Sequence, residues 1–246
     1  MMTPAATALG LHLRVLVEDD GVAAAGVVVD APVGAPRTQG AVLDLVTGAG
    51  AGARAEVLTF EHEHIPAEVL AQVEAMGVPV RPSPGALLHA QDKIVMRRRL
   101  TELGVPCPRW APVPDAAALD AFLDSVGGEA VVKTARGGYD GKGVRVVRSS
   151  AEVADWFEAS ASGGPALLAE EKVPFVRELA VLLARRPGGE VAVWPVVQTV
   201  QVDGVCAEVI APAPGLDPAL AREAVEAAVT VAAGVDVTGV LAVELF

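Results

Sequence analysis

Apolar and polar positions follow two different periods over the first third of the chain. Short apolar runs of strand length are separated by stretches in which apolar residues recur every three or four positions. The predicted elements are a helix at 3–10, strands at 11–17 and 55–60 with a short apolar run at 27–30 between them, and a helix at 66–76. Because strand and helix alternate, we predict a small α/β unit of the parallel type over residues 1–83. A unit of this kind should open with a strand, so we expect its first strand to be missing.

The helical period dominates the middle of the chain. The predicted elements are an amphipathic helix at 84–103, a second helix at 115–126, and strands at 130–133 and 144–148. Gly104 and Pro106 stop the first of these helices. Ser149 and Glu152 have the spacing of a capping box, which predicts a further helix through Phe157.

Beyond Pro165 the pattern becomes that of an antiparallel meander. The predicted elements are strands at 167–171, 177–186, 190–200 and 205–212, a helix at 218–233 and a last strand at 239–246. Two tight turns favour this interpretation, Pro187-Gly188-Gly189 and Asp203-Gly204.

Composition narrows the class of protein. The chain has 246 residues, of which 52% are hydrophobic and 20% charged, and a mean hydropathy of +0.44, so a folded protein is expected rather than a disordered one. No apolar run reaches the length of a membrane span and no signal peptide is recognisable, so we predict a soluble cytoplasmic protein that binds no membrane. Cys107 and Cys206 are expected to be reduced core thiols. The net charge of −12 argues against nucleic-acid binding.

The strongest chemical signal is the segment VVKTARGGYDGKGV, residues 131–144. Four glycines within seven residues let backbone N–H groups approach phosphate oxygens, and Lys133 and Lys142 stand at its entry and tip. Neither a Walker loop nor a dinucleotide fingerprint fits, because a strand rather than a helix follows. The segment is either a flap that closes over phosphates or a plain glycine-rich hairpin.

Carboxylates supply the remaining candidates. Glu170 and Glu171 end a strand, where unpaired backbone groups could contact an adenine; an ordinary solvated strand end is the alternative. Glu178 alternates with apolar residues, so it faces a cleft or a wet sheet face. Glu244 stands in an apolar strand, where a buried carboxylate would need a partner such as a nucleotide-bound Mg²⁺, unless it lies on the exposed side.

A cluster of acidic and histidine residues, Glu61-His62-Glu63-His64, follows the predicted strand at 55–60. On an extended segment the two glutamates point one way and the two histidines the other. A substrate-facing strand terminus is therefore favoured over a metal site.

Together these segments resemble the N5-carboxyaminoimidazole ribonucleotide synthase family of ATP-grasp enzymes. The matching phrases run in order and span nearly the whole chain: TFEHEHIP, VPVRPSPGAL, AQDK, LGVP, VVKTARGGYDGKGV, EEKVPFVREL, WPVV, IAPAP and GVLAVELF. The resemblance implies an α/β (α+β) protein: an ATP-grasp fold preceded by a truncated Rossmann-like (preATP-grasp) domain. Residues 1–83 would form that domain, 84–169 the central subdomain with its flap, and 170–246 an incomplete C-terminal subdomain.

The resemblance also implies roles for individual residues. Lys93 and Lys133 would contact ATP phosphates, and Gly138, Tyr139, Asp140, Gly141, Lys142, Gly143 and Val144 would form the flap over them. Glu170, Glu171, Lys172 and Val173 would hold the adenine, and Glu178 the ribose. Tyr139, Asp140 and Lys142 would be catalytic, and Glu61, Glu63, Tyr139 and Lys142 would bind the ribonucleotide. Glu244 would be a magnesium ligand. Gln201 stands where many members have a histidine that contacts ATP.

The implied reaction is that of an ATP-dependent carbon–nitrogen ligase with ATP and Mg²⁺. ATP phosphorylates bicarbonate to carboxyphosphate. That species, or CO₂ released from it, carboxylates the amine of aminoimidazole ribonucleotide in purine biosynthesis and leaves ADP and phosphate. The resemblance further implies a homodimer at full length. The N-terminal GGGQLG-type turn and about a third of the enzyme after Phe246 are expected to be missing, so we expect the fragment itself to be inactive.

Two other functions remain open from the sequence. One is a related ATP-grasp ligase, such as the formate-using purine transformylase or a biotin carboxylase-like protein. The other is a nucleotide-binding fragment without catalytic activity.

Overall fold

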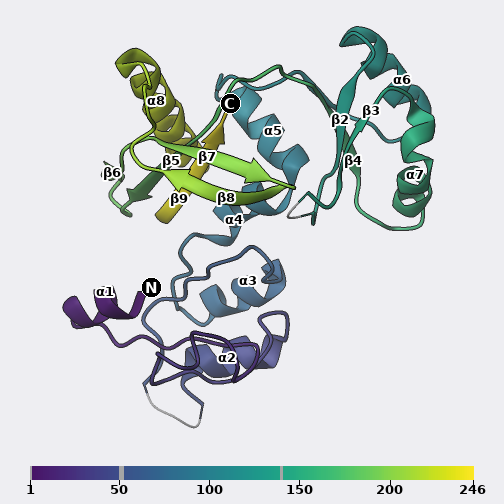
Figure 1. Cartoon of the computed structure of the whole chain (residues 1–246). Coiled ribbons are helices and arrows are strands. Elements are labelled where there is room, and N and C mark those ends of the chain that lie inside the picture. Colours follow the sequence, from purple (N-terminus) through teal and green to yellow (C-terminus); the bar gives the residue numbers. More distant parts are fainter. Residues whose placement is uncertain (1, 50–52, 139–140) are drawn as a thin grey trace. The chain divides into compact units, whose positions relative to one another are not determined.

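The computed structural model describes residues 2–49, 53–138 and 141–246. It divides into two compact units, residues 1–84 and residues 85–246 (Figure 1). Among the described residues, no helix is long and apolar enough to cross a membrane.

The first unit is built from three helices: α1 (Met2–Ala8), α2 (Gln39–Thr47) and α3 (Ala67–Ala75). The predictions of helices near α1 and α3 are confirmed, whereas α2 was not predicted. The strands predicted at 11–17 and 55–60 are wrong as strands, because the described backbone makes only isolated parallel bridges there: Arg14 with Asp30, Val17 with Val33, and Leu58 with Val80. Val29 is fully exposed, so the apolar run at 27–30 buries only Val28 and contributes little to a sheet.

The second unit begins with two helices in place of the single helix predicted at 84–103. α4 (Pro84–Gln91) and α5 (Lys93–Glu102) are separated by Asp92, whose backbone is extended at φ −134°. The Asp92 carboxylate accepts hydrogen bonds from the N–H groups of Ile94 (3.0 Å) and Val95 (3.1 Å). Asp92 therefore acts as the N-cap of a new helix, which satisfies donors that a continuous helix would have used internally.

The first sheet of this unit is antiparallel, in the order β1-β4-β2-β3. Its strands are β1 (Trp110–Pro112), β4 (Leu167–Glu171), β2 (Ala130–Thr134) and β3 (Val144–Val147). One face packs on α6 (Ala116–Ser125), α7 (Ala154–Ala161) and the 3₁₀ turn Ser150–Val153, around Leu119, Phe122 and Val132. Alternation along β2 and β4 places Lys133 and Glu170 on the opposite face.

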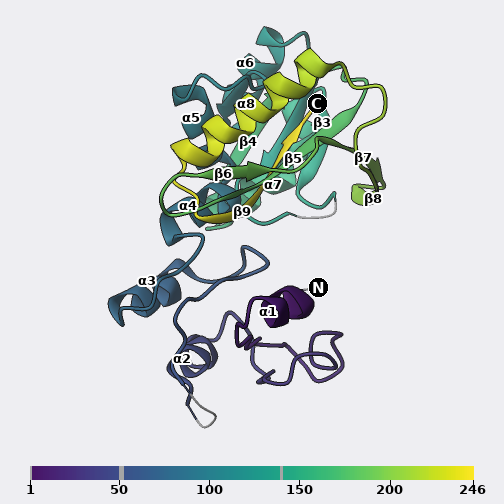
Figure 2. The same ribbon diagram turned by 90° about the vertical axis from the view of Figure 1, so that its left-hand side faces the viewer.

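The second sheet contains β6 (Val191–Val193), β5 (Glu178–Arg185), β7 (Val197–Val202) and β8 (Val205–Ile210) in that order, with β9 (Gly239–Leu245) paired to β5. Helix α8 (Pro218–Gly234) lies along one face of this sheet (Figure 2). Val181, Leu183 and Ala228 are fully buried where helix and sheet meet. Apolar residues at alternate strand positions therefore form this core, and the positions between them, which include Glu178 and Glu244, lie on the other face.

Two features of the predicted meander are wrong. Residues 167–171 pair with β1 and β2 in the first sheet, so the predicted subdomain boundary at 169/170 falls inside β4. The predicted strand at 190–200 is divided into β6 and β7 around Trp194-Pro195, where proline cannot donate to a ladder.

The two predicted turns join antiparallel strands, as expected. Asp203 and Gly204, at φ +52° and +81°, join β7 to β8, and Pro187-Gly188-Gly189 lies between β5 and β6. The capping box at Ser149 is confirmed, although the 3₁₀ turn precedes α7. Both cysteines are free, but Cys206 is exposed on β8, so its prediction as a core thiol is wrong.

Candidate functional site

Glu170 is the centre of a network of charged side chains on the face of the first sheet opposite α6 and α7. It is 3% exposed, and no other charged residue in the described ranges is buried. Its carboxylate accepts from the ammonium of Lys133, on the neighbouring strand β2, at 2.6 Å, and from the Nε of Arg97, on α5, at 2.5 Å. Lys133 and Glu170, predicted separately from the sequence, thus meet through cross-strand pairing of β2 and β4.

The ionisation of Glu170 follows from these contacts. Burial raises the pKa of Glu170, but the hydrogen bond from Arg97 and the charges of Lys133 and Arg97 outweigh this effect, so the pKa lies below its ordinary value. Glu170 is therefore an anion at neutral pH, shared between two cations.

The glycine-rich loop after β2 is folded tightly onto Thr134. The N–H of Thr134 donates to the carbonyl of Gly143 at 3.0 Å. Gly138 and Gly143 have φ of +80° and +73°, and a Cβ on either would come within 2.6 Å of a neighbour, the Lys142 carbonyl or the Thr134 hydroxyl. These two positions therefore require glycine.

Gly141 of the loop lies beside the second sheet. A Cβ added to Gly141 would lie 3.5 Å from Cα of Gly204 in the β7–β8 turn. Lys142 and Val144, which lead from the loop into β3, are exposed. Tyr139 and Asp140, predicted as catalytic residues, lie outside the described residues.

Lys93 joins the first turn of α5 to the base of this loop. Its ammonium donates to the carbonyl of Gly137 at 2.9 Å, and its N–H donates to the carbonyl of Ala135 at 2.8 Å. Asp92, beside it, pairs with Arg136 at 2.8 Å. The start of α5 and the loop are therefore held together, which places Lys93 close to the glycines.

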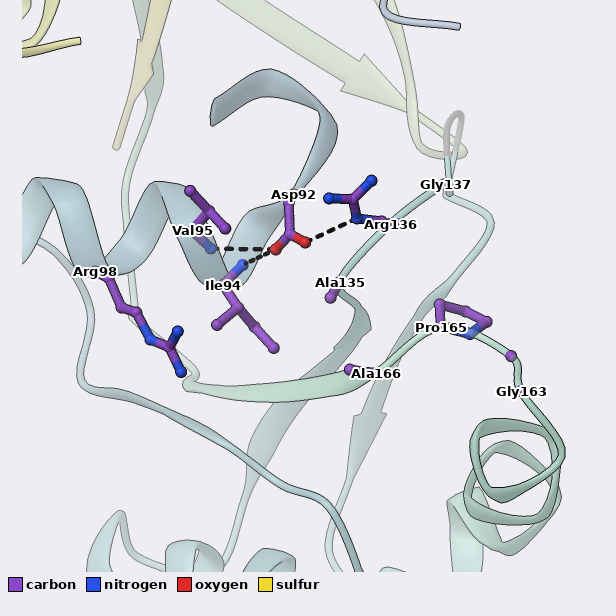
Figure 3. A pocket seen from close by; sticks show the side chains of 11 residues that line it. Asp92, Ile94, Val95, Arg98, Ala135, Arg136, Gly137, Gly163, Pro165 and Ala166 are labelled. Carbon is purple, nitrogen blue, oxygen red and sulfur yellow. Dashed lines mark hydrogen bonds and ion pairs between the residues drawn. The ribbon is translucent and has the colours of Figure 1, made fainter. Parts of the chain in front are cut away.

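A cavity of about 610 Å³ opens at this junction. Figure 3 shows Asp92 and Arg136 facing each other across its rim, with Arg98 projecting from α5 nearby. Residues 163–166, which lead into β4, form its far wall. Lys133 and Glu170 do not line this cavity, so it adjoins the predicted phosphate-binding residues without containing them.

The side chains that follow Glu170 have structural partners. Glu171 accepts from the backbone N–H of Arg109 at 2.8 Å and from its Nε at 2.9 Å, contacts that hold the pKa of Glu171 below its usual range. Lys172 pairs with Glu129 at 2.9 Å. The β4 ladder ends at Glu171, so Lys172 and Val173 lie beyond it. Any contact of these residues with an adenine would therefore come chiefly from their backbone.

Glu178, Gln201 and Glu244 share the face of the second sheet that lies away from α8. In the ladder, Thr199 lies opposite Glu178, and Glu244 lies opposite Ala180, so alternation puts Glu178 and Glu244 on the side away from α8. Gln201 lies two residues after Thr199 on β7 and shares this side. Glu244 is exposed, so the interpretation of a buried carboxylate is wrong; the apolar alternate positions of β9 face α8 instead.

The acidic and histidine cluster lies in the first unit. The rings of His62 and His64 are 5.2 Å apart, which agrees with the two histidines pointing the same way. The residues that the structure describes contain no group of three or more His, Cys, Asp or Glu side chains that could hold a metal ion. A role for Glu61 and Glu63 in substrate binding stays a prediction.

Arg97 is the functional candidate that the sequence analysis missed. It was assigned only to an amphipathic helix, in the run Arg97-Arg98-Arg99, where three arginines look alike. A helical period could have found it, because position 97 lies on the same face as Lys93.

Comparison with known proteins places these features in a family. Residues 98–246 match the model of the ATP-grasp domain. The chain is 48% identical over all 246 residues to the N5-carboxyaminoimidazole ribonucleotide synthase of Mycobacterium tuberculosis, of which it spans 56%.

Solved structures agree with this match. The N5-carboxyaminoimidazole ribonucleotide synthetase of Thermus thermophilus is 34% identical, with a TM-score of 0.84 over the whole chain and 64% of that structure. The synthase of Aspergillus clavatus in complex with ADP and 5-aminoimidazole ribonucleotide is 28% identical, with a TM-score of 0.85 over the whole chain and 62% of that structure. These matches confirm the predicted ATP-grasp fold, and the chain belongs to the ATP-grasp family.

Proposed function

We propose that the complete protein containing this chain is an ATP-dependent ligase that carboxylates 5-aminoimidazole ribonucleotide with bicarbonate. The products are N5-carboxyaminoimidazole ribonucleotide, ADP and phosphate. The observation that carries the proposal is the 48% identity to a synthase of that name, which extends over all 246 residues. The complex of the Aspergillus clavatus synthase with ADP and the ribonucleotide supports the same substrates.

The arrangement of charges supports a nucleotide site. Lys93 and Lys133 flank the base of the glycine-rich loop, the first through the Gly137 carbonyl and the second through β2. Two ammonium groups beside glycine backbone suit the phosphates of ATP, because catalysis of phosphoryl transfer rests mainly on positioning and charge neutralisation. The loop would close over the phosphates and exclude water from the carboxyphosphate formed from bicarbonate.

Magnesium fits the carboxylates on the face of the second sheet away from α8. Glu244 and Glu178 present carboxylates there, and carboxylate oxygens with nucleotide phosphates are the ligands that Mg²⁺ takes in such sites. Bound Mg²⁺ would neutralise charge that develops on the phosphates. Cytoplasmic location remains a prediction from the sequence composition, and a homodimer remains a prediction from the family resemblance.

Replacement of Lys133 tests the site directly. We expect Lys133→Ala in the complete protein to lower kcat/KM for ATP by at least about 100-fold, because it removes a cation from the phosphates. Arg186→Gln, which removes an exposed arginine from the β5–β6 turn, is the control and should retain full activity. Turnover by Lys133→Ala equal to that of the control would contradict the site assignment.

Replacement of Glu244 tests the metal. Glu244→Gln keeps the size of the side chain and removes the anionic ligand, so the Mg²⁺ concentration that gives half-maximal rate should rise. A Mg²⁺ titration of the rate at saturating ATP measures this value. An unchanged titration curve would exclude Glu244 as a ligand.

A further inference from the structure

Arg97 makes its hydrogen bonds with protein groups, one of which is Glu170 of the proposed nucleotide site. Its Nε donates to one oxygen of Glu170 at 2.5 Å, while the ammonium of Lys133 donates to the other at 2.6 Å. A second nitrogen of the same guanidinium, Nη1, donates to the sulfur of Cys107 at 3.6 Å. The Arg97 side chain is 12% exposed, so most of it is shielded from solvent while it makes these two hydrogen bonds.

The charges in this group do not cancel. Two cations share one carboxylate, so the group of Arg97, Glu170 and Lys133 carries a net charge of +1. Arg97 occupies one Glu170 oxygen and neutralises much of the anion, and Lys133 therefore keeps positive charge that is available to another anion. In the absence of Arg97, Glu170 and Lys133 would form an isolated neutral pair.

The position of Glu170 gives this arrangement its strength. Because the carboxylate is 3% exposed, water screens its attraction for Lys133 only weakly. Without Arg97, Glu170 would hold the Lys133 ammonium firmly against its carboxylate. Arg97, reaching from α5 to the opposite oxygen, competes for that attraction.

We propose that Arg97 is a positioning residue that keeps Lys133 available to nucleotide phosphates by neutralising Glu170 from the side of α5. The inference rests on the proposed function, since it takes Lys133 as a phosphate contact. The inference adds that Lys133 is not sufficient for ATP affinity. That affinity also depends on an arginine whose own hydrogen bonds go to protein groups.

The test is a set of variants of the complete protein, with KM for ATP, kcat and thermal unfolding measured for each. Arg97→Gln should raise KM for ATP by about 10-fold or more, the value of one charge-assisted hydrogen bond, with a smaller change in kcat. Arg97→Lys keeps the charge but not the guanidinium geometry and should raise it by only about 3-fold. Arg186→Gln again serves as the control.

Removal of the carboxylate separates positioning from direct contact. In a Glu170→Gln background the anion that Arg97 neutralises is gone, so adding Arg97→Gln should leave KM for ATP within about 3-fold of the Glu170→Gln value. The double variant should also have a lower KM for ATP than Arg97→Gln alone. If Arg97 contacted the phosphates itself, its replacement would lower the affinity for ATP equally in both backgrounds.

The outcomes distinguish the inference from the function on which it rests. Unmodified protein without ATP turnover would overturn both. If the unmodified protein is active and both Arg97→Gln and Arg97→Lys have its KM for ATP, the inference alone is overturned. It is also overturned if the KM for ATP of the double variant is no lower than that of Arg97→Gln. Should Arg97→Gln fail to fold, Arg97→Lys retains the charge and still tests the predicted increase.

Discussion

At the scale of single residues, Glu170 shows how a site and a fold can depend on the same atom. The carboxylate is buried between strands and joins β2, β4 and α5 through two ion pairs. The sequence placed it at the end of a strand and named Lys133 as a phosphate contact. It could not show that the two side chains meet, because they lie 37 positions apart in the chain and the pairing register of β2 with β4 decides which residues face each other.

Removal of the Glu170 carboxylate should destabilise the second unit. Glu170→Ala leaves Arg97 and Lys133 as neighbouring cations without their shared anion, which costs about 3 kcal/mol for a buried pair. Urea unfolding followed by circular dichroism measures the change. A decrease in unfolding free energy below about 0.5 kcal/mol would show that solvent compensates for the missing carboxylate.

The lowered pKa of Glu170 predicts a dependence of stability on pH. The unfolded chain, with an ordinary glutamate pKa of about 4.3, takes up a proton at higher pH than the folded chain does. The contribution of Glu170 is therefore complete above that value and is lost as the pH falls through the lower pKa of the folded state.

The Glu170→Gln variant isolates this contribution. Its stability should fall less steeply than that of the unmodified protein as the pH decreases below about 5, by at most about 1.4 kcal/mol per pH unit. Unfolding free energies measured from pH 6 to pH 3 give both slopes. Equal slopes would mean that Glu170 has the same pKa in the folded and unfolded states.

At the scale of elements, the start of α5 was the feature that sequence periodicity could not resolve. The apolar spacing continues through Asp92, so one helix was predicted at 84–103. The break at Asp92 arises from its side chain, which caps α5 and binds Arg136 of the glycine-rich loop. Asp92 was visible in the sequence as a helix-capping type, but its partner comes from another part of the chain.

A close approach of α5 and α8 provides a prediction at this scale. A Cβ on Gly234, at the end of α8, would meet the Leu103 side chain after α5, with Cδ2 at 2.6 Å. Arg99 donates to the Gly234 carbonyl at 2.7 Å, so the helix end cannot easily move away. We therefore expect Gly234→Val to lower the unfolding free energy by about 1–3 kcal/mol.

Gly40→Val provides the matched control for that substitution. Gly40 is also helical and has open space around its Cα, so the cost should be within about 0.5 kcal/mol. Chemical denaturation of both variants gives the comparison. Equal effects at the two positions would contradict the tight contact at Gly234.

At the scale of the whole molecule, the order of sequence motifs predicted the ATP-grasp fold, whereas the periodicity of apolar positions predicted only local elements. The sequence predicted the antiparallel turns, α8 and the final strand, because tight turns and long amphipathic helices are local signals. The parallel bridges of the first unit and the assignment of β4 to the first sheet depend on distant pairing partners. Glu244 illustrates the same limit, since only the sheet shows which side of β9 faces α8.

The extent of the matched chain defines what the whole protein must supply. All 246 residues match the Mycobacterium tuberculosis synthase but span 56% of its length. The charged residues of the proposed nucleotide site lie within residues 85–246, while Glu61 and Glu63 lie in the first unit. The proposed reaction therefore has to be measured on the complete protein.

The most direct measurement of the central claim is ADP release by the complete protein with ATP, Mg²⁺ and bicarbonate, with and without 5-aminoimidazole ribonucleotide. We predict that ADP release requires the ribonucleotide, stops when bicarbonate is removed and is not restored by formate. ADP release that ignores the ribonucleotide, or that requires formate in place of bicarbonate, would contradict the proposed carboxylation.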